Sequence, residues 1–358
     1  MRCKQFLVML CLLLCARFVF GIESPEQTDY AKGPLFGKTM YVPFLIHYTF
    51  PSLPASAGEQ WDFNYHVSAY LVQDIYYIEN KPLPESGGRS YDKANVERDY
   101  ESTIGELGLS FNPLRELQVG MDMRLIAYYR GFGDPFLEGF HGAFGFPNGG
   151  REFFLQNQLY INIPNNSGVS LFLDEPVVSF GDIDLWTKWT FFEIPRLSLA
   201  LLGAGKIPSG RLNTLSGSNY PDLALGILSD IRALWWLSVY AQAGLVVPFD
   251  MKSYPMFNGL AGVEFSPWDF LSFNLQMNLK TSPISGGYEN HYFQPQINIL
   301  AGFIFRYKAP SRQIFTWQFY LEEDTFTHQG ADITFNLMFI HSLNFAKLKV
   351  VHEKRKGY

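Results

Sequence analysis

Cysteine is almost missing from this sequence of 358 residues. The three copies, Cys3, Cys11 and Cys15, all lie within the first fifteen positions. We expect residues 1–21 to be a secretory signal peptide that is cut away. The mature chain would then have no cysteine, which excludes a disulfide framework and a cysteine-based metal site.

The signal-peptide prediction rests on the order of residues at the start of the chain. A short positively charged stretch precedes the apolar run at residues 6–15, and Gly21 is a small residue suited to cleavage. A membrane-anchoring helix is the first alternative, but the run is too short to cross ~30 Å of hydrocarbon and Arg17 interrupts it. A lipoprotein leader is the second, but Cys15 lacks a small residue directly before it.

Charge is also scarce, since only 17% of residues are charged against about 25% in soluble domains. The formal net charge of −6 becomes −9 without the leader, so no excess of positive charge exists for binding nucleic acid. No run of about eighteen apolar residues follows the leader, although 17% of residues are aromatic. This composition fits either a large soluble β-fold or an outer-membrane barrel.

Apolar and polar residues alternate with a period of two in several segments. The clearest are residues 61–71, 117–125, 269–279 and 333–345; from Trp61 to Leu71, for example, the odd positions are apolar and the even ones through Ser68 are polar. A period of two places successive side chains on opposite faces of a strand. These segments are therefore predicted to be β-strands.

Turn-forming residues between such segments divide residues 59–345 into about fourteen strands, which begin near residues 59, 100, 117, 153, 168, 182, 196, 221, 236, 256, 268, 294, 314 and 332. Short turns are predicted at 112–116, 164–168, 193–196, 266–268 and 308–312, and long connections near 73–98, 131–152, 208–220 and 281–293. Strands of about ten residues suit a bilayer crossing, whereas strands of soluble proteins average ~5 to 6. We therefore predict an all-β fold, a transmembrane antiparallel barrel in the outer membrane, over a soluble sandwich.

The two ends of the mature chain do not share the strand pattern. Residues 22–58 are rich in proline and include the apolar stretch 41–50. They are expected to form either a periplasmic arm or a plug-like insert in the barrel, and burial of the apolar residues favours the insert. Residues 346–358 form a basic tail, expected to be solvated.

Two segments carry a resemblance to known proteins. The loop FHGAFGFPNGGR at residues 140–151, with the sequence YTFP at 48–51, resembles a family of Gram-negative outer-membrane barrels of unknown function. The loop residues of interest are His141, Gly145, Pro147, Gly149, Gly150 and Arg151. The strand number and plug-like start are similar to long-chain fatty-acid channels of the outer membrane, which implies a fold and not a function.

No catalytic or metal-binding motif stands out in the sequence. The seven histidines are scattered, so no cofactor and no metal are expected and an enzyme is not predicted; an outer-membrane hydrolase is kept as an alternative. Charged residues on the polar strand faces are the better candidates, because Lys or Arg facing lipid near the midplane would cost ~2 to 4 kcal/mol. The candidates for the lumen are Glu106, Asp122, Arg124, Arg130, Asp182, Asp184, Lys188, Lys206 and Arg306.

These observations favour a passive outer-membrane channel for small hydrophobic nutrients. The partners expected are membrane lipid, the barrel-assembly machinery and a small hydrophobic substrate, with no nucleic acid; the oligomeric state is left open. The alternative is a surface protein with a closed lumen, whose long loops serve structure, adhesion or the binding of a partner. Charged residues that only pair with one another inside the barrel would fit either hypothesis.

Overall fold

The computed structural model describes residues 31–77, 89–93, 95–145, 150–163, 171–250, 253–283, 295–311, 313–324 and 331–346. The expected signal peptide, Pro147, Gly149, the expected turn at 164–168 and all but the first residue of the basic tail lie outside these ranges.

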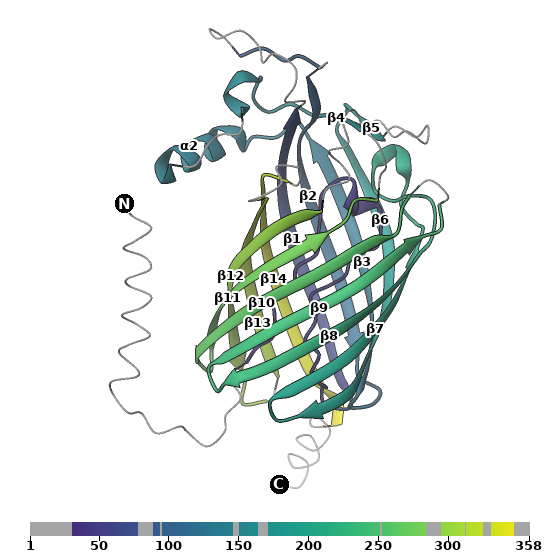
Figure 1. Ribbon diagram of the computed structural model, residues 1–358, viewed down its shortest axis with the longest axis vertical. Helices are drawn as coiled ribbons and strands as arrows, with labels where there is room; N and C mark the ends of the chain where they lie inside the picture. Colours follow the sequence, from purple (N-terminus) through teal and green to yellow (C-terminus); the bar gives the residue numbers. More distant parts are fainter. Residues whose placement is uncertain are drawn as a thin grey trace, which may run out of the picture.

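Twelve antiparallel strands form a closed barrel (Figure 1). Each strand pairs with the next around the wall, and the first pairs with the last from Asp62–Asn344 to Gln73–Ile333. The wall strands are β1 (Asp62–Tyr77), β2 (Val96–Phe111), β3 (Leu117–Tyr129), β6 (Val177–Ile194), β7 (Leu197–Ile207), β8 (Asp222–Leu234), β9 (Leu237–Pro248), β10 (Met256–Trp268), β11 (Leu271–Lys280), β12 (Gln296–Lys308), β13 (Ile314–Asp324) and β14 (Ile333–Asn344). Because the barrel is closed, every wall strand has a hydrogen-bonded neighbour on both sides, as a bilayer requires.

The barrel wall has two strands fewer than the fourteen expected from the sequence. The segments predicted to start near residues 153 and 168 form the short strands β4 (Tyr160–Ile163) and β5 (Leu171–Leu173), which lie outside the wall. β4 pairs with β2 only at Arg98 and Asp99, while β3 pairs directly with β6. Four and three residues cannot cross a membrane that requires ~9 to 11, so these strands extend a loop.

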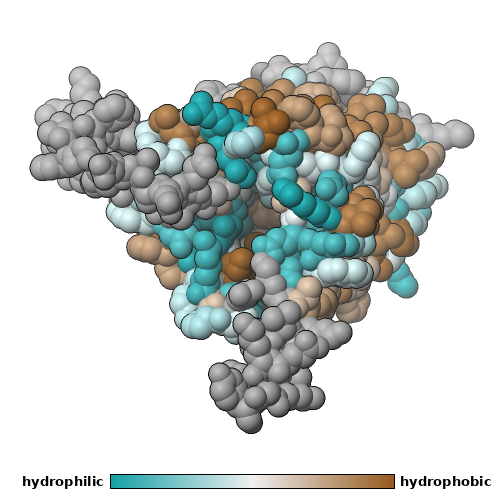
Figure 2. All heavy atoms as spheres, turned by 90° about the horizontal axis from the view of Figure 1, so that it is seen from below, coloured by the Kyte–Doolittle hydropathy of each residue, from teal (hydrophilic) through white to brown (hydrophobic). Residues whose placement is uncertain are grey.

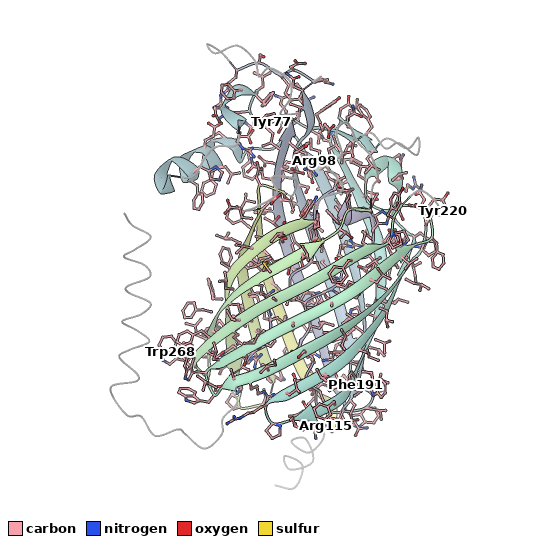
Figure 3. The ribbon with its side chains drawn as sticks, in the orientation of Figure 1. Tyr77, Arg98, Arg115, Phe191, Tyr220 and Trp268 are labelled. Atoms are coloured by element: carbon pink, nitrogen blue, oxygen red, sulfur yellow. The ribbon has the colours of Figure 1, made fainter. Side chains whose placement is uncertain are left out.

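Exposure alternates along the wall strands as the sequence pattern predicts. In β8, Leu223, Leu225 and Ile227 are exposed, whereas Ala224, Gly226 and Leu228, which alternate with them, are buried. Large aromatic side chains project from the outer surface near the strand ends, including Phe191, Tyr220 and Trp268 (Figure 3). An apolar outer band with aromatic residues at its margins is typical of barrels that span a membrane.

Short turns gather at one end of the barrel and long connections at the other (Figure 1). The long connections carry helix α2 (Asp134–Phe144) and the 3-10 turns η2 (Arg151–Phe153) and η3 (Leu212–Thr214). Among the described residues, no helix is both long enough and apolar enough to cross a membrane.

Residues 31–57 lie inside the barrel and are called the lumenal segment here (Figure 1). The segment enters at the short-turn end, where Lys32 Nζ donates to the carbonyl of Trp268 at 3.0 Å. It bends at the 3-10 turn η1 (Phe44–Ile46) and returns to the same end before β1. Its two limbs touch where Ser52 N donates to Gly37 O at 3.3 Å.

Candidate functional site

Inward-facing side chains hold the ascending limb of the lumenal segment, residues 31–43, by its backbone. Glu264 accepts hydrogen bonds from the amides of Lys32 and Gly33, and Gln318 accepts one from the amide of Phe36 at 2.9 Å. Because this limb is neither helix nor strand, its buried amides need partners from elsewhere. The barrel wall supplies them as side-chain oxygens.

Lys38 lies at the centre of the barrel among carboxylates. Its Nζ contacts Glu106 Oε2 at 2.8 Å and Asp122 Oδ2 at 2.7 Å, and all three side chains are fully buried. His66 Nε2 lies 3.3 Å from Glu106 Oε1, and Trp186 Nε1 donates to Asp122 Oδ2 at 3.1 Å. A buried ammonium group is tolerable only with such pairing.

Two cations hold the bend of the segment. Arg124 donates to Leu45 O at 3.2 Å and pairs with Asp184 at 3.3 Å. Lys206 donates to Ile46 O at 2.7 Å and pairs with Asp182 at 2.7 Å. The carbonyls at the end of η1 therefore receive charge-assisted hydrogen bonds from wall residues that are themselves neutralised.

The descending limb, residues 47–57, is fixed in the same manner. Tyr48 N donates to Asp222 Oδ2 at 2.7 Å, and Ser56 N donates to Asp230 Oδ2 at 3.0 Å. Lys188 Nζ donates to two carbonyls of the limb, those of Pro54 at 2.8 Å and Ser56 at 2.9 Å. Backbone polar groups in both limbs and at the bend are thus bound to side chains of the wall.

Apolar packing accompanies these polar contacts. Buried side chains of the segment and of the wall form one hydrophobic cluster, in which Phe44 and Leu45 join Ile104, Leu202 and Leu300. Phe50 lies against two glycines of the wall: a Cβ on Gly226 or Gly244 would come within 3.0 Å or 2.5 Å of its ring. The glycines create the space that seats Phe50.

A cavity of about 840 Å³ opens at the short-turn end between the segment and the wall. Figure 2 views this end, where hydrophilic side chains surround a hollow in the middle and hydrophobic ones lie at the margin. Lys32, Asp230 and Arg306 are among the residues that line it. The cavity is a polar vestibule that ends at the lumenal segment.

The structure places most of the candidate lumen residues against the segment or its ion pairs. Seven of them are buried inside the barrel: Glu106, Asp122, Arg124, Asp182, Asp184, Lys188 and Lys206. Arg306 is half-buried and donates to the carbonyls of Ala31 and Lys32. Arg130 differs from the other candidates because β3 ends at Tyr129. Arg130 is therefore exposed and belongs to the loop that follows the strand.

Several residues of the site were not singled out from the sequence. Asp222, Asp230 and Glu264 lie on inward faces of β8 and β10, so their place in the alternating pattern was a usable signal. Lys38 and His47 gave no such signal, because they lie in a segment without any period.

The loop that carries the family resemblance lies at the long-connection end of the barrel. His141 is half-buried on α2, Gly145 ends that helix at φ 76°, and Gly150 has φ 89°. Arg151 is buried and pairs with Asp134 at the start of α2 and with Asp332 just before β14. Arg151 thereby ties this loop to the barrel rim.

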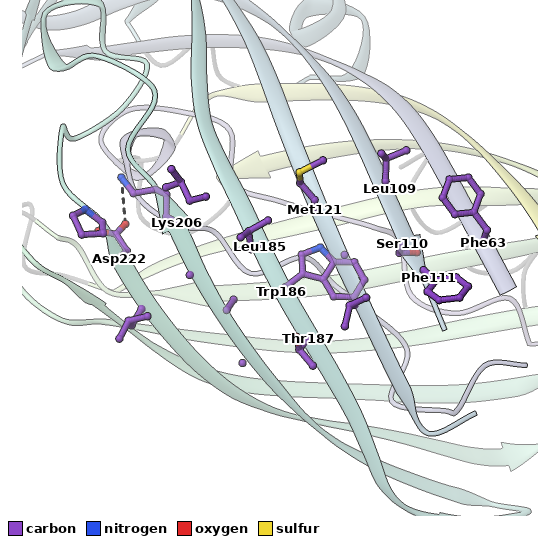
Figure 4. A pocket seen from close by; sticks show the side chains of 18 residues that line it. Phe63, Leu109, Ser110, Phe111, Met121, Leu185, Trp186, Thr187, Lys206 and Asp222 are labelled. Carbon is purple, nitrogen blue, oxygen red and sulfur yellow. Dashed lines mark ion pairs between the residues drawn. The ribbon is translucent and has the colours of Figure 1, made fainter. Parts of the chain in front are cut away.

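A groove of about 850 Å³ runs along the outer wall across β2, β3, β6, β7 and β8 (Figure 4). Leu109, Met121 and Leu185 line it. Gly203 and Gly205, which have no side chains, form its floor on β7. The ion pair of Lys206 and Asp222, 3.5 Å apart and also part of the lining, belongs to the buried lumenal face of the wall (Figure 4). The outer part of the groove is therefore an apolar surface on the lipid-facing side.

A closed barrel with an apolar outer wall and a filled, charged lumen defines the class of membrane-spanning β-barrels. Within that class, the chain belongs to the family described as "Protein of unknown function (DUF3187)", whose model matches residues 90–341. The expected relation to an uncharacterised barrel family is confirmed.

Solved structures of outer-membrane channels are similar to this chain. The COG4313 outer membrane channel from Pseudomonas putida F1 has a TM-score of 0.51 at 11% identity, with 85% of this chain and 100% of that chain covered. A FadL homologue of Pseudomonas aeruginosa has a TM-score of 0.39 at 9% identity, with 87% and 98% covered. The Pseudomonas putida toluene transporter TodX has a TM-score of 0.34 at 10% identity, with 91% and 100% covered.

No curated protein matches this chain in sequence.

Proposed function

We propose that this protein is an outer-membrane channel for small hydrophobic nutrients, in which the lumenal segment is the plug. The observation that carries the proposal is the seating of residues 31–57 inside a closed barrel by wall side chains from the vestibule to the bend. A segment without regular structure, held by many separate contacts, can shift without the wall unfolding. The fold shared with the COG4313 outer membrane channel supports a channel.

Apolar groups at the interface between wall and segment support the hydrophobic substrate class. Tyr70, Tyr100 and Tyr320 are fully buried inward-facing residues of the wall and belong to the same cluster as Phe44 of the segment. Displacement of the segment would expose this surface along the lumen. A small apolar solute could then replace the apolar contacts that the segment makes.

The export route and location belong to the same proposal. Residues 1–21 act as the signal peptide, the barrel-assembly machinery inserts residues 59–345, and membrane lipid covers the apolar band. The short turns then lie on the periplasmic side, so the vestibule opens to the periplasm.

Flux through liposomes tests the channel. Vesicles that contain the purified protein should admit a small aromatic hydrocarbon faster than empty vesicles, and deletion of residues 31–57 should raise the rate at least tenfold. Glucose serves as the polar comparison and should gain less from the deletion. Equal rates for the parent and the deletion variant, both folded, would contradict the plug.

A surface protein with a closed lumen is the second candidate. The observation in its favour is the aromatic surface at the long-connection end, where Phe132 is 73% exposed and Phe136 is 61% exposed. Exchange of residues 131–152 for a short linker should then abolish adhesion to a host or cell surface and leave permeability unchanged. The opposite pattern would favour the channel.

A further inference from the structure

His66, Gly108 and Asp122 lie side by side on three neighbouring strands. The strand registers pair His66 with Gly108 and Gly108 with Asp122, so a residue without a side chain separates the two. A Cβ on Gly108 would come within 1.9 Å of His66 Cε1 and 2.4 Å of Asp122 Oδ1. Glu106 is the next inward-facing residue of the same strand, so three side chains with metal-binding atoms converge over Gly108.

The distances between these atoms suit a transition metal. His66 Nε2 lies 3.3 Å from Glu106 Oε1 and 3.6 Å from Asp122 Oδ1, and the three ligand atoms lie within 4.8 Å of one another. Zinc bonds of about 2.0 to 2.2 Å in a tetrahedron place neighbouring ligand atoms about 3.3 to 3.6 Å apart. Imidazole nitrogens and carboxylate oxygens are both zinc ligands, and three protein ligands are enough for a zinc site that takes water in the fourth position.

The oxygens that face His66 are not those that bind Lys38. Lys38 Nζ contacts Glu106 Oε2 and Asp122 Oδ2, which leaves Oε1 and Oδ1 on the histidine side. Asp122 Oδ1 is buried and accepts no hydrogen bond within the part of the chain that the structure describes. A buried carboxylate oxygen without a donor, aimed at an imidazole and a second carboxylate, is a ready ligand for a cation.

We propose that His66, Glu106 and Asp122 form a divalent transition-metal site for which Lys38 is the competing cation. A dication beside the same two carboxylates would repel the ammonium group a few ångströms away. Metal binding and the seating of Lys38 therefore oppose each other, and a bound metal loosens the lumenal segment at its centre. The site depends only on the geometry of the wall and is independent of what the barrel transports.

Zinc titration of the purified, folded protein tests the site. After treatment with a chelator, the parent should bind one Zn²⁺ ion, and Lys38→Met should bind it at least tenfold more tightly. Lys32→Met is the matched control, since Lys32 lies in the same segment but contacts Trp268 and not the cluster; its affinity should equal that of the parent. His66→Ala in the Lys38→Met background should lower the affinity at least tenfold.

The position of the segment provides a second measurement. A single cysteine in place of the buried Ser52, which contacts Gly37 next to Lys38, should react with a maleimide faster when Zn²⁺ is present. The same variant carrying His66→Ala should show no response to zinc.

Two results would overturn the metal site. One is a folded Lys38→Met protein that binds no Zn²⁺ at millimolar concentration; Lys38→Gln gives the same test if the methionine variant does not fold. The other is unchanged zinc affinity on removal of the His66 imidazole, which would place the ion elsewhere. Neither result bears on solute flux, so failure of this site and failure of the channel are distinguishable.

Discussion

At the scale of single residues, Lys206 illustrates how the barrel interior accommodates charge. Its buried ammonium group contacts the carboxylates of Asp182 at 2.7 Å and Asp222 at 3.5 Å, and it also donates to Ile46 O and Ser218 Oγ. One cation thus serves two acids and one backbone carbonyl of the lumenal segment. Removal of the Lys206 ammonium group leaves both carboxylates buried without this cation.

Lys206→Met should therefore destabilise the folded protein strongly. Loss of the cation leaves two buried carboxylates, and breaking a buried pair costs about 3 to 5 kcal/mol. The comparison is Lys308→Met, because the Lys308–Asp269 pair has side chains 50% and 54% exposed; exposed pairs contribute about 1 kcal/mol or less. Urea unfolding in detergent, followed by tryptophan fluorescence, gives the free energy of unfolding of each variant. An equal loss of this free energy in Lys206→Met and Lys308→Met would contradict this description of the interior.

Gly108→Ala should also destabilise the protein. The added methyl group would overlap His66 and Asp122, and such overpacking costs about 1 to 3 kcal/mol. Gly105, on the outward face of the same strand, has open space where a Cβ would stand. Gly105→Ala is thus the matched control and should unfold at the urea concentration of the parent or slightly above it; a Gly108→Ala midpoint equal to that of the control would show that the cluster does not need the glycine.

At the scale of elements, α2 is the feature that the sequence pattern did not predict. The sequence predicts a long connection near residues 131–152, yet Asp134 to Phe144 form a helix. The end signals were present, since Pro135 stands in the first turn and Gly145 closes the helix in the left-handed conformation. Glycine is unfavourable in a helix interior, so the glycines within the segment counted against a helix despite these end signals.

Arg151 should be the contact that holds α2 to the barrel. It bridges Asp134 in the first turn of the helix and Asp332 beside β14. Arg151→Gln keeps hydrogen-bonding capacity but removes the charge, so the amides of α2 should exchange with deuterium at least tenfold faster while those of β8 keep their protection. Unchanged exchange in α2 would show that other contacts fix the helix.

The wall strands were predictable for a physical reason that does not extend to the lumenal segment. Lipid on one side and a polar lumen on the other impose an alternation on each strand, and this alternation is visible in a local window of the sequence. Inward placement of Glu106 and Asp184 follows from the same rule. The strands β4 and β5 were assigned to the wall because turn residues bound them, although they are too short to cross.

At the scale of the whole molecule, the barrel and the lumenal segment form one packed unit. Contacts such as Lys38–Glu106 and Tyr48–Asp222 join residues 68 and 174 positions apart in the chain. The apolar residues of the segment favour an insert in the barrel, but no local sequence pattern records such pairings, so the wall residues that hold the segment and the cluster around Lys38 could not be predicted. The closed barrel and its likeness to the COG4313 outer membrane channel establish the fold, whereas the role of the segment rests on these contacts.

The most direct test of the account is whether fixing the lumenal segment to the wall stops flux. The parent chain has no cysteine after Cys15, so cysteines introduced at Lys38 and Glu106 are the only thiols in the described barrel. Flux of a small aromatic hydrocarbon into liposomes is measured before and after a short bismaleimide joins the two positions, with each single-cysteine variant as the control. The account predicts that cross-linking lowers flux to the level of empty vesicles; unchanged flux through the cross-linked barrel would contradict it.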